Sequence, residues 1–298
     1  MCRDITMPWS PELAEPRNKP MAPCRNRARA GLVLVAVLSA SCGGSPASPT
    51  PRGSTTSPKY SEASFREAAR ITAAAATEVF RSEHAGLSER DVKAMIDGVF
   101  AQLGSGPPAF SSIVAAGPDG IDLHYPGDEG LLTDGELVLF DIGATSNEHC
   151  ADVSRTYPVS RRFTPRQRGL YQLVLDVQAV AAGALTQHDS LYSMDASARQ
   201  QFRASPLRAR DSSGNEQTMD AFFVHSLGHY IGREVHGTDT GFGVREVLQA
   251  GQVLAIEPGL YIPSEGIAIR VEDTYLVGTQ RLTCLSCDAP KHVDAIER

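Results

Sequence analysis

The chain has 298 residues, of which 42% are apolar, and a formal net charge of −7, which suits a globular protein of one large or two small domains. Residues 1–41 carry a net charge of +3, so the remaining residues carry about −10 and contain no basic stripe. This acidic balance argues against nucleic acid as a partner.

Residues 1–41 have the features of a targeting segment and are set aside before the fold is considered. Arg25, Arg27 and Arg29 precede an apolar stretch at residues 31–38 that is too short to span a bilayer stably. Met21 is an alternative start, in which case residues 1–20 would not be part of the protein.

Small residues before Cys42, followed by a Gly-, Ser-, Pro- and Thr-rich tether over residues 42–60, resemble a bacterial lipoprotein signal. The resemblance implies lipidation of Cys42 and a protein that is lipid-anchored in the bacterial cell envelope, on its periplasmic or extracellular side. An ordinary secretory signal or an uncleaved anchor is the alternative. We expect residues 61–298 to form the folded domain.

An exported chain would keep three cysteines in that domain, Cys150, Cys284 and Cys287. Cys284 and Cys287 are close enough in sequence to form a small disulfide, and free thiols are the alternative. A single Cys-x-x-Cys with no second pair of ligands nearby is weak support for a zinc site.

Apolar residues at helical spacing predict helices over residues 62–80, 88–103 and 165–185, and a further helix over 193–202. A Ser-x-x-Asp capping box at Ser88 and the Thr164-Pro165 pair mark two of the helix starts. The polar stretch at residues 204–217 is expected to be a loop.

Apolar and alternating runs predict strands over residues 111–115, 121–125, 136–142, 150–159, 252–258 and 267–277. Asp152 and Ser154 should share one face of their strand. In the last strand Arg270 and Glu272 should face one way and Asp273 the other.

Three histidines, His225, His229 and His236, lie in one short window, FFVHSLGHYIGREVHG at residues 222–237. Gly228 and Gly232 argue against a long helix here. We therefore expect an irregular strand or loop that directs the imidazoles toward one cavity.

Four carboxylates lie in or beside apolar strands: Asp141, Asp152, Glu257 and Glu272. A buried carboxylate without a partner is costly, and Arg155 and Arg270 are too few to neutralise four acids. Carboxylates together with imidazoles suit a pair of divalent ions. The alternative is that each acid is a separate strand-end residue exposed to water.

Taken in chain order, these motifs resemble those of the pita-bread metallopeptidases, which include prolidase, aminopeptidase P and methionine aminopeptidase. The matching residues are His124, Asp141-Ile-Gly143, Asp152, His225-Ser-Leu-Gly-His229, His236, Glu257-Pro-Gly259 and Arg270-Val-Glu272. The flanking runs SIVAAGPDGIDLHY and RTYPVSRRFTPRQRGLYQLVL resemble the prolidase and aminopeptidase P branch. The likeness covers residues 61–283 and implies an α+β fold with a curved antiparallel sheet flanked by helices, present as the catalytic domain only.

The resemblance also implies a ligand set for two divalent metal ions. Asp152 and Glu272 would bridge both ions, Asp141 would bind one, and His229 with Glu257 would bind the other. Oxygen-rich ligation makes Mn²⁺ the first choice, with Co, Fe and Zn as alternatives.

The catalytic roles follow from the same resemblance. A hydroxide between the ions would attack the scissile carbonyl, with Glu257 as proton shuttle. His225 and His236 would bind substrate and stabilise the oxyanion, and His124 would act at the same centre. Arg270 would orient the carboxylates without binding metal.

The expected activity is that of an exopeptidase that cleaves Xaa-Pro bonds, either an Xaa-Pro aminopeptidase or an Xaa-Pro dipeptidase. Two alternatives remain open: a metal-dependent hydrolase of non-proline substrates, and a non-catalytic peptide-binding lipoprotein with the same fold. The expected partners are a peptide substrate, a membrane through the lipid anchor, and a second copy of the chain in a homodimer.

Overall fold

The computed structural model describes residues 60–82, 85–183 and 185–298. The expected targeting segment, almost all of the expected tether and Cys42, the predicted lipidation site, lie outside these ranges. The α-helices within them are α1 (Glu62–Arg81), α2 (Glu89–Gln102), α3 (Pro165–Ala181), α4 (Leu191–Ala204) and α5 (Val293–Ile296). In the part of the chain that is described, no helix combines the length and apolar character needed to cross a membrane.

The strands are short and pair antiparallel. They are β1 (Ile113–Ala116), β2 (Leu137–Ile142), β3 (Thr145–Ser146), β4 (His149–Cys150), β5 (Val153–Pro158), β6 (Arg208–Arg210), β7 (Glu216–Thr218), β8 (Val253–Ile256), β9 (Gly259–Ile262), β10 (Ile267–Arg270), β11 (Asp273–Val277) and β12 (Leu282–Cys284). The larger sheets have the orders β1-β2-β5 and β12-β11-β8, and β9 pairs with β10.

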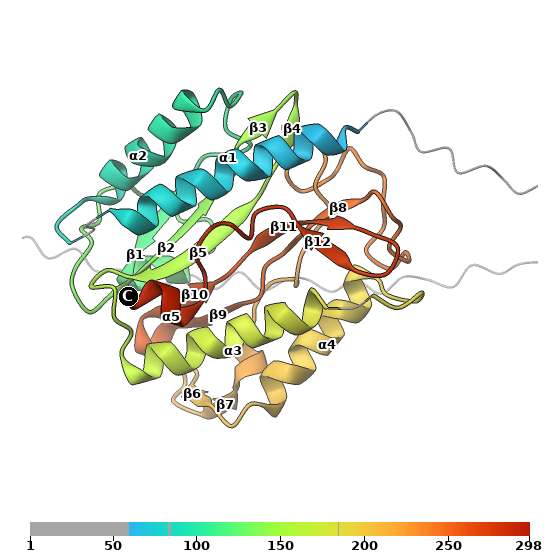
Figure 1. The fold of residues 1–298 in the computed structure, drawn as a ribbon. Helices are drawn as coiled ribbons and strands as arrows, with labels where there is room; N and C mark the ends of the chain where they lie inside the picture. Colours follow the sequence, from blue (N-terminus) through green and yellow to red (C-terminus); the bar gives the residue numbers. More distant parts are fainter. Residues whose placement is uncertain (1–59, 83–84, 184) are drawn as a thin grey trace, which may run out of the picture. The chain divides into compact units, whose positions relative to one another are not determined.

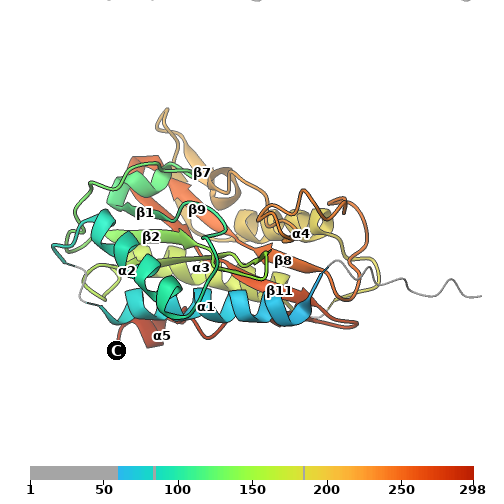
Figure 2. The same ribbon diagram turned by 90° about the horizontal axis from the view of Figure 1, so that it is seen from above.

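Helices cover the strands on two sides, with α1 and α2 on one side and α3 and α4 on the other (Figure 1; Figure 2 gives the view from above). Capping boxes begin three of the helices, at Ser88, Thr164 and Ser190, because each hydroxyl accepts the N–H of the residue three positions on. The predicted helices are all present, although α3 ends at Ala181 rather than near residue 185.

The prediction of a strand over residues 121–125 is wrong. Residues Gly117–Ile121 form a 3₁₀ turn, η1, in which Gly117 has a φ of +53°. The Asp122 carboxylate then accepts the N–H of His124 at 3.1 Å, which closes a second turn. Local side-chain bonding therefore overrides the alternating pattern and places His124 in a loop.

The polar stretch at residues 204–217 is not only a loop, because it contains the hairpin of β6 and β7. The Asp211 carboxylate accepts the N–H groups of Ser213 and Asn215, each at 2.9 Å. Gly214 has a φ of +84°, which a glycine adopts without strain. Turn chemistry thus folds a mostly polar segment in which only Leu207 and Ala209 pack against the hydrophobic core.

The run at residues 267–277 was expected to be one strand, but the structure divides it between two sheets. β10 pairs with β9 before the break, and β11 pairs with β8 after it. At the break the Val271 N–H bonds Pro258 O at 3.3 Å and the Glu272 N–H bonds Ser154 O at 3.0 Å. Glu272 is thereby carried onto the end of β5.

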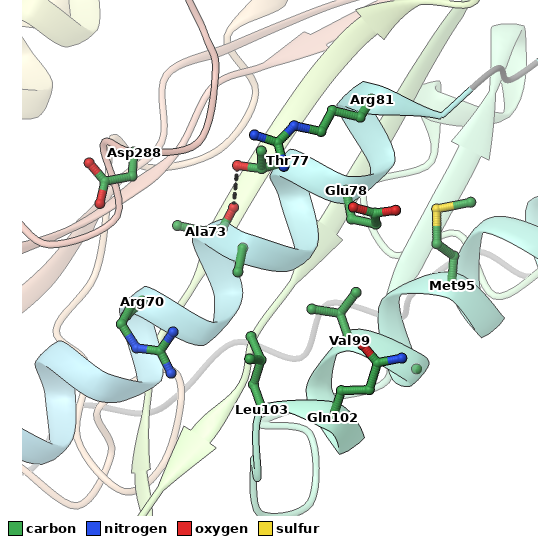
Figure 3. A pocket seen from close by; sticks show the side chains of 12 residues that line it. Arg70, Ala73, Thr77, Glu78, Arg81, Met95, Val99, Gln102, Leu103 and Asp288 are labelled. Carbon is green, nitrogen blue, oxygen red and sulfur yellow. Dashed lines mark hydrogen bonds between the residues drawn. The ribbon is translucent and has the colours of Figure 1, made fainter.

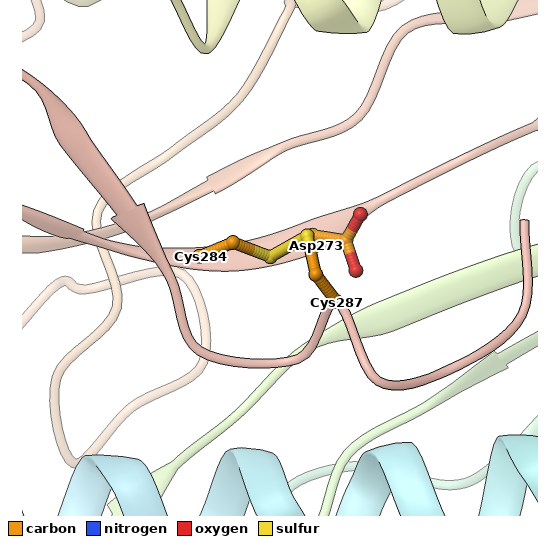
Figure 4. A group of neighbouring side chains, drawn as sticks. All are labelled: Asp273, Cys284 and Cys287. Atoms are coloured by element: carbon orange, nitrogen blue, oxygen red, sulfur yellow. A yellow bond between two sulfur atoms is a disulfide. The ribbon is translucent and has the colours of Figure 1, made fainter.

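A network of buried ion pairs lies behind β11. Arg155, fully buried, donates to Asp273 at 2.7 Å and to the carbonyls of Ala289 and Pro290 at 3.2 Å each. Lys291 donates to Asp273 at 2.7 Å. Cys284 and Cys287 form a disulfide beside Asp273 (Figure 4), which decides between the two states left open by the sequence.

Candidate metal centre

A cavity of about 730 Å³ is lined by every residue that the sequence assigns to the site. They are His124, Asp141, Asp152, His225, His229, His236, Glu257, Arg270 and Glu272. The cavity wall also includes apolar side chains such as Phe110, Leu123 and Val235. Residues separated by more than a hundred positions in the chain therefore meet in one place, as a catalytic or binding site requires.

Asp141 and Asp152 come from the paired strands β2 and β5. Asp141 lies opposite Ser154 in the register, and Asp152 stands just before β5 begins. The backbone of Asp152 is fixed by Thr274, whose hydroxyl accepts the Asp152 N–H at 2.9 Å and donates to Asp152 O at 2.8 Å. The hairpin expected from the sequence thus places both carboxylates at one end of the sheet.

Ser154 joins the two charged residues of the closing segment. Its hydroxyl donates to Glu272 Oε2 at 2.7 Å and accepts from Arg270 Nε at 2.7 Å. Arg270 also donates to Asp141 Oδ2 at 2.7 Å. Arg270 therefore orients the carboxylate of Asp141 directly and that of Glu272 through Ser154.

The histidine segment follows the edge of β8 without forming a regular strand. The Ala255 N–H donates to His229 O at 2.9 Å, and the Glu257 N–H donates to Leu227 O at 2.7 Å. Gly228 is required for this approach, since a Cβ there would lie 2.0 Å from Ala255 O. His229 is thus held with its Nε2 at 3.5 Å from Asp152 Oδ2, and at 3.8 Å from the nearest carboxylate oxygens of Glu257 and Glu272.

His225 is held by residues that sequence reasoning did not identify. Tyr261 OH lies 3.1 Å from His225 Nε2 and accepts from Arg270 Nη1 at 2.7 Å. Arg199, in α4, donates to His225 O at 2.7 Å and bonds Asp195. Tyr261 stands in the EPGLYIP run, but only the pairing of β9 with β10 brings it beside Arg270.

The other two histidines are exposed at the wall of the cavity. The His236 ring packs edge-on against His229 with 4.8 Å between centroids. Partial desolvation by the cavity wall, together with His229 and His124, lowers the pKa of His236. His124 and His236 are therefore neighbours of the buried acids rather than part of the same cluster.

Burial and mutual repulsion raise the pKa values of the clustered carboxyl groups. The pKa of Asp152 is raised by burial and by Asp141 and Glu257, and that of Glu272 by burial and by Asp152. Burial also raises the pKa of Glu257. In contrast, burial and the charge of Arg270 lower the pKa of His225 to about 4, so this imidazole is neutral at physiological pH.

Three buried carboxylate oxygens in this cluster have no hydrogen-bond partner: Asp141 Oδ1, Asp152 Oδ1 and Glu272 Oε1. Buried polar atoms are rarely left without a partner unless an ion or water completes the site. Ligand atoms of Asp152, His229 and Glu272 lie within 4.8 Å of one another. The arrangement, oxygen-rich with one imidazole, fits divalent cations.

Two other features of the described residues do not form such a site. A hollow of about 640 Å³ between α1 and α2 is lined by residues such as Arg70, Thr77 and Leu103, with no histidine among them (Figure 3). The group of Asp273, Cys284 and Cys287 has its two sulfur atoms joined in the disulfide (Figure 4). The carboxylate cavity is therefore the candidate for metal chemistry.

Comparisons with known proteins agree with this reading of the cavity. The model of metallopeptidase family M24 matches residues 63–279. Xaa-Pro aminopeptidase of Escherichia coli is 29% identical over 250 residues, covering 78% of this chain and 57% of that protein. Xaa-Pro dipeptidase of Pyrococcus furiosus is 33% identical over 202 residues, covering 66% of this chain and 54% of that protein.

The solved structure of proline aminopeptidase P II from Yersinia pestis superposes with a TM-score of 0.71 at 31% identity, covering 79% of this chain and 58% of that one. The chain spans about half the length of the curated relatives it matches. The expected α+β pita-bread fold is confirmed. The chain belongs to metallopeptidase family M24.

Proposed function

We propose that this protein is an exopeptidase that cleaves Xaa-Pro bonds with the help of two divalent cations. The observation that carries the proposal is the set of three buried carboxylate oxygens without partners, gathered beside His229. An anionic cluster of this kind is costly to bury unless cations balance it.

The ligands proposed for the cations are Asp141, Asp152, His229, Glu257 and Glu272. Asp152 and Glu272 would bind both ions, which is supported by their charge interactions with Asp141 and by their oxygens lying 3.5 and 3.8 Å from His229 Nε2. Four carboxylates and one imidazole favour Mn²⁺, with Co, Fe and Zn as alternatives. When bound, the cations would lower the pKa of a water held between them, so that hydroxide is available near neutral pH.

The surrounding side chains supply the remaining steps of peptide hydrolysis. Glu257, whose pKa is raised by burial, is suited to accept a proton and return it to the leaving amine. His225 is neutral, and Tyr261 and Arg270 hold it in a chain of hydrogen bonds. The single N–H of the neutral ring lies at Nδ1, which faces Ser226 O at 2.8 Å, so Nε2 is the acceptor that can bind a substrate N–H. His124 and His236 line the cavity and would donate to a developing oxyanion.

The preference for proline is supported by the relatives, which are described as an Xaa-Pro aminopeptidase and an Xaa-Pro dipeptidase. The cavity is compatible with that preference because Phe110, Leu123 and Val235 offer apolar contacts for a pyrrolidine ring. Whether the chain acts as aminopeptidase or dipeptidase depends on where the substrate's second end is recognised.

The test is hydrolysis of Xaa-Pro peptides by the full chain, stripped of metal and then loaded with Mn²⁺. We expect turnover by the native chain and none by Asp152→Asn, with elemental analysis showing metal bound to the first and depleted in the second. Turnover of other peptides but no Xaa-Pro peptide would favour the non-proline hydrolase. A native chain that binds no metal would favour the non-catalytic peptide-binding lipoprotein.

We also propose that Cys42 carries lipid and anchors the protein in the cell envelope, and that the catalytic domain forms a homodimer. The support for the anchor is the small-residue, cysteine and tether pattern of the sequence. Fractionation of cells that express the native chain or Cys42→Ala tests the anchor, since only the native chain should partition with membranes. Light scattering of the purified protein tests the dimer.

A further inference from the structure

The cavity wall contains one cation that the proposed metal centre does not use. Lys93 projects from α2 and lines the cavity together with Ser112, Tyr125 and Pro126. Its ammonium group donates to Gly127 O at 2.6 Å. Among the residues that the structure describes, no carboxylate lies within 4.0 Å of it.

The nearby acids have other partners. The Asp128 carboxylate is bound by Arg90 at 2.9 Å, and Glu129 lies 3.7 Å from the same guanidinium. Arg90, and more weakly Lys93, lower the pKa of Asp128. On the inner side of the cavity, Asp141 is held by Arg270. An ammonium group has three N–H donors, so Lys93 keeps donors that its single carbonyl bond does not occupy.

A second polar group on the same wall also lacks a partner. Ser112 is 9% exposed, and its hydroxyl oxygen makes no hydrogen bond within the described residues. Ser112 directly precedes β1, where Ile113 lies opposite Asp141, so this wall adjoins the metal centre. Lys93, which keeps unused donors, and Ser112, which has no hydrogen-bond partner among the described residues, line the same cavity as the apolar Phe110 and are suited to receive a carboxylate on a short aliphatic stem.

The charge balance of the cavity also supports binding of a carboxylate by Lys93. Two divalent cations would balance the four acids of the centre and a hydroxide would balance Arg270, so Lys93 is left as a positive charge in the cavity. A positive charge in a cavity attracts anionic ligands more strongly than it would on an open surface.

We propose that Lys93 is a specificity-determining residue that selects peptides with a carboxylate close to the scissile bond, through its ammonium group and with Ser112 beside it. This inference rests on the proposed Xaa-Pro peptidase function. The carboxylate has two sources, an Asp or Glu side chain next to the proline or the C-terminus of an Xaa-Pro dipeptide, and the same chemistry would recognise both.

The experiment compares two matched substrate pairs on the Mn²⁺-loaded full chain. Glu-Pro-Ala against Gln-Pro-Ala tests the side chain, and Ala-Pro against Ala-Pro amide tests the C-terminus. We expect the native chain to prefer the acidic member of at least one pair by about tenfold in kcat/KM, as for a hydrogen bond to a charged group. Lys93→Met should bring that ratio close to one, whereas Lys93→Arg should preserve it.

Arg66→Gln is the matched control, because it removes a positive charge from the neighbouring helix α1 at an exposed residue that does not line the cavity. It should keep the native ratio, and the native preference should shrink in high salt. A ratio near one for both pairs in the native chain, or an unchanged ratio in Lys93→Met, would overturn the inference. If no Xaa-Pro peptide is cleaved, the proposed function fails, and calorimetric binding of the same peptides to native and Lys93→Met protein decides the role of Lys93.

Discussion

Glu272 and Asp273 are adjacent acids that the fold treats in opposite ways. Both are buried, with 1% and 0% of their surface exposed. Asp273 has both oxygens occupied, by Arg155 and Ser286 on one and by Lys291 and Gln178 on the other. Glu272 has one oxygen bonded to Ser154 and the other without a partner.

Their pKa values differ accordingly. Although burial opposes it, Arg155 and Lys291 lower the pKa of Asp273, whereas burial and neighbouring acids raise that of Glu272. Both carboxylates are desolvated, but Asp273 forms ion pairs with Arg155 and Lys291, whereas Glu272 keeps an oxygen without a partner in the described part of the chain. Burial of an acid alone therefore does not distinguish a candidate metal ligand, whereas a buried carboxylate oxygen without a protein partner is available to a cation.

The strongest test of this contrast replaces each acid by its amide. Glu272→Gln should reduce peptide hydrolysis by about a thousandfold, which corresponds to about 4 kcal/mol of transition-state stabilisation supplied by the metals. Its metal-free form should be no less stable than the native metal-free form, because the buried negative charge is gone. Rate assays measure the loss of hydrolysis, and urea unfolding in EDTA measures the stability of the metal-free chain. A lower metal-free stability in Glu272→Gln would contradict the role of Glu272 as a metal ligand.

Asp273→Asn should have the opposite effect on stability. It leaves the buried charge of Arg155 with only carbonyl partners, and the loss should be about 3 kcal/mol in free energy of unfolding. Urea unfolding of the metal-free chain measures it. Adding Arg155→Met to the variant should restore part of the loss, and additive losses in this double-mutant cycle would show that the two side chains are not coupled.

The Cys284–Cys287 disulfide lies beside Asp273, so we expect it to contribute to the stability of the fold and not to hydrolysis. Replacing Cys284 and Cys287 by serine should lower the free energy of unfolding by about 2 kcal/mol, the entropy expected for so short a loop. Hydrolysis by the metal-loaded chain at moderate temperature should change much less, since neither sulfur lines the cavity. A loss of activity larger than the loss of folded protein would show that the disulfide affects the metal centre as well as stability.

Tyr261→Phe tests the metal centre, to which Glu272 belongs, without removing a charge. The change deletes the hydroxyl that bonds His225 and Arg270, and we expect about a tenfold loss in kcat. Metal content should remain native, because Tyr261 touches none of the proposed ligands except through Arg270. A rise in KM with an unchanged kcat would instead assign the hydroxyl to substrate binding.

The smallest effect is a dependence on pH. A carboxyl group whose folded pKa is raised stabilises the fold below its unfolded pKa, and that stability is lost as pH rises through the folded pKa. The stability of the metal-free Glu272→Gln variant relative to the native metal-free chain should therefore grow as pH rises, by at most about 1.4 kcal/mol per pH unit. Unfolding curves at several pH values measure it, and a difference that shrinks with rising pH would contradict the raised pKa.

The helices could be predicted because spacing and caps are local features, and these identified α1, α2 and α3. The site residues were predicted from the resemblance of their motifs to a known family, and all nine line one cavity. The division of residues 267–277 could not be predicted, since the run is uniformly strand-like and the break is made by distant partners, Pro258 and Ser154. The positions of Tyr261 and Arg199 depend on the same long-range pairings.

The segment that follows the last proposed ligand supports the metal centre without supplying a ligand to it. Arg155 and Tyr157 donate to the carbonyl of Pro290, and Tyr171 donates to that of Lys291, so residues 290–291 hold β5 and α3. A chain cut after residue 272 would keep every proposed ligand but lose these bonds, so the ligand set by itself is not expected to build the site.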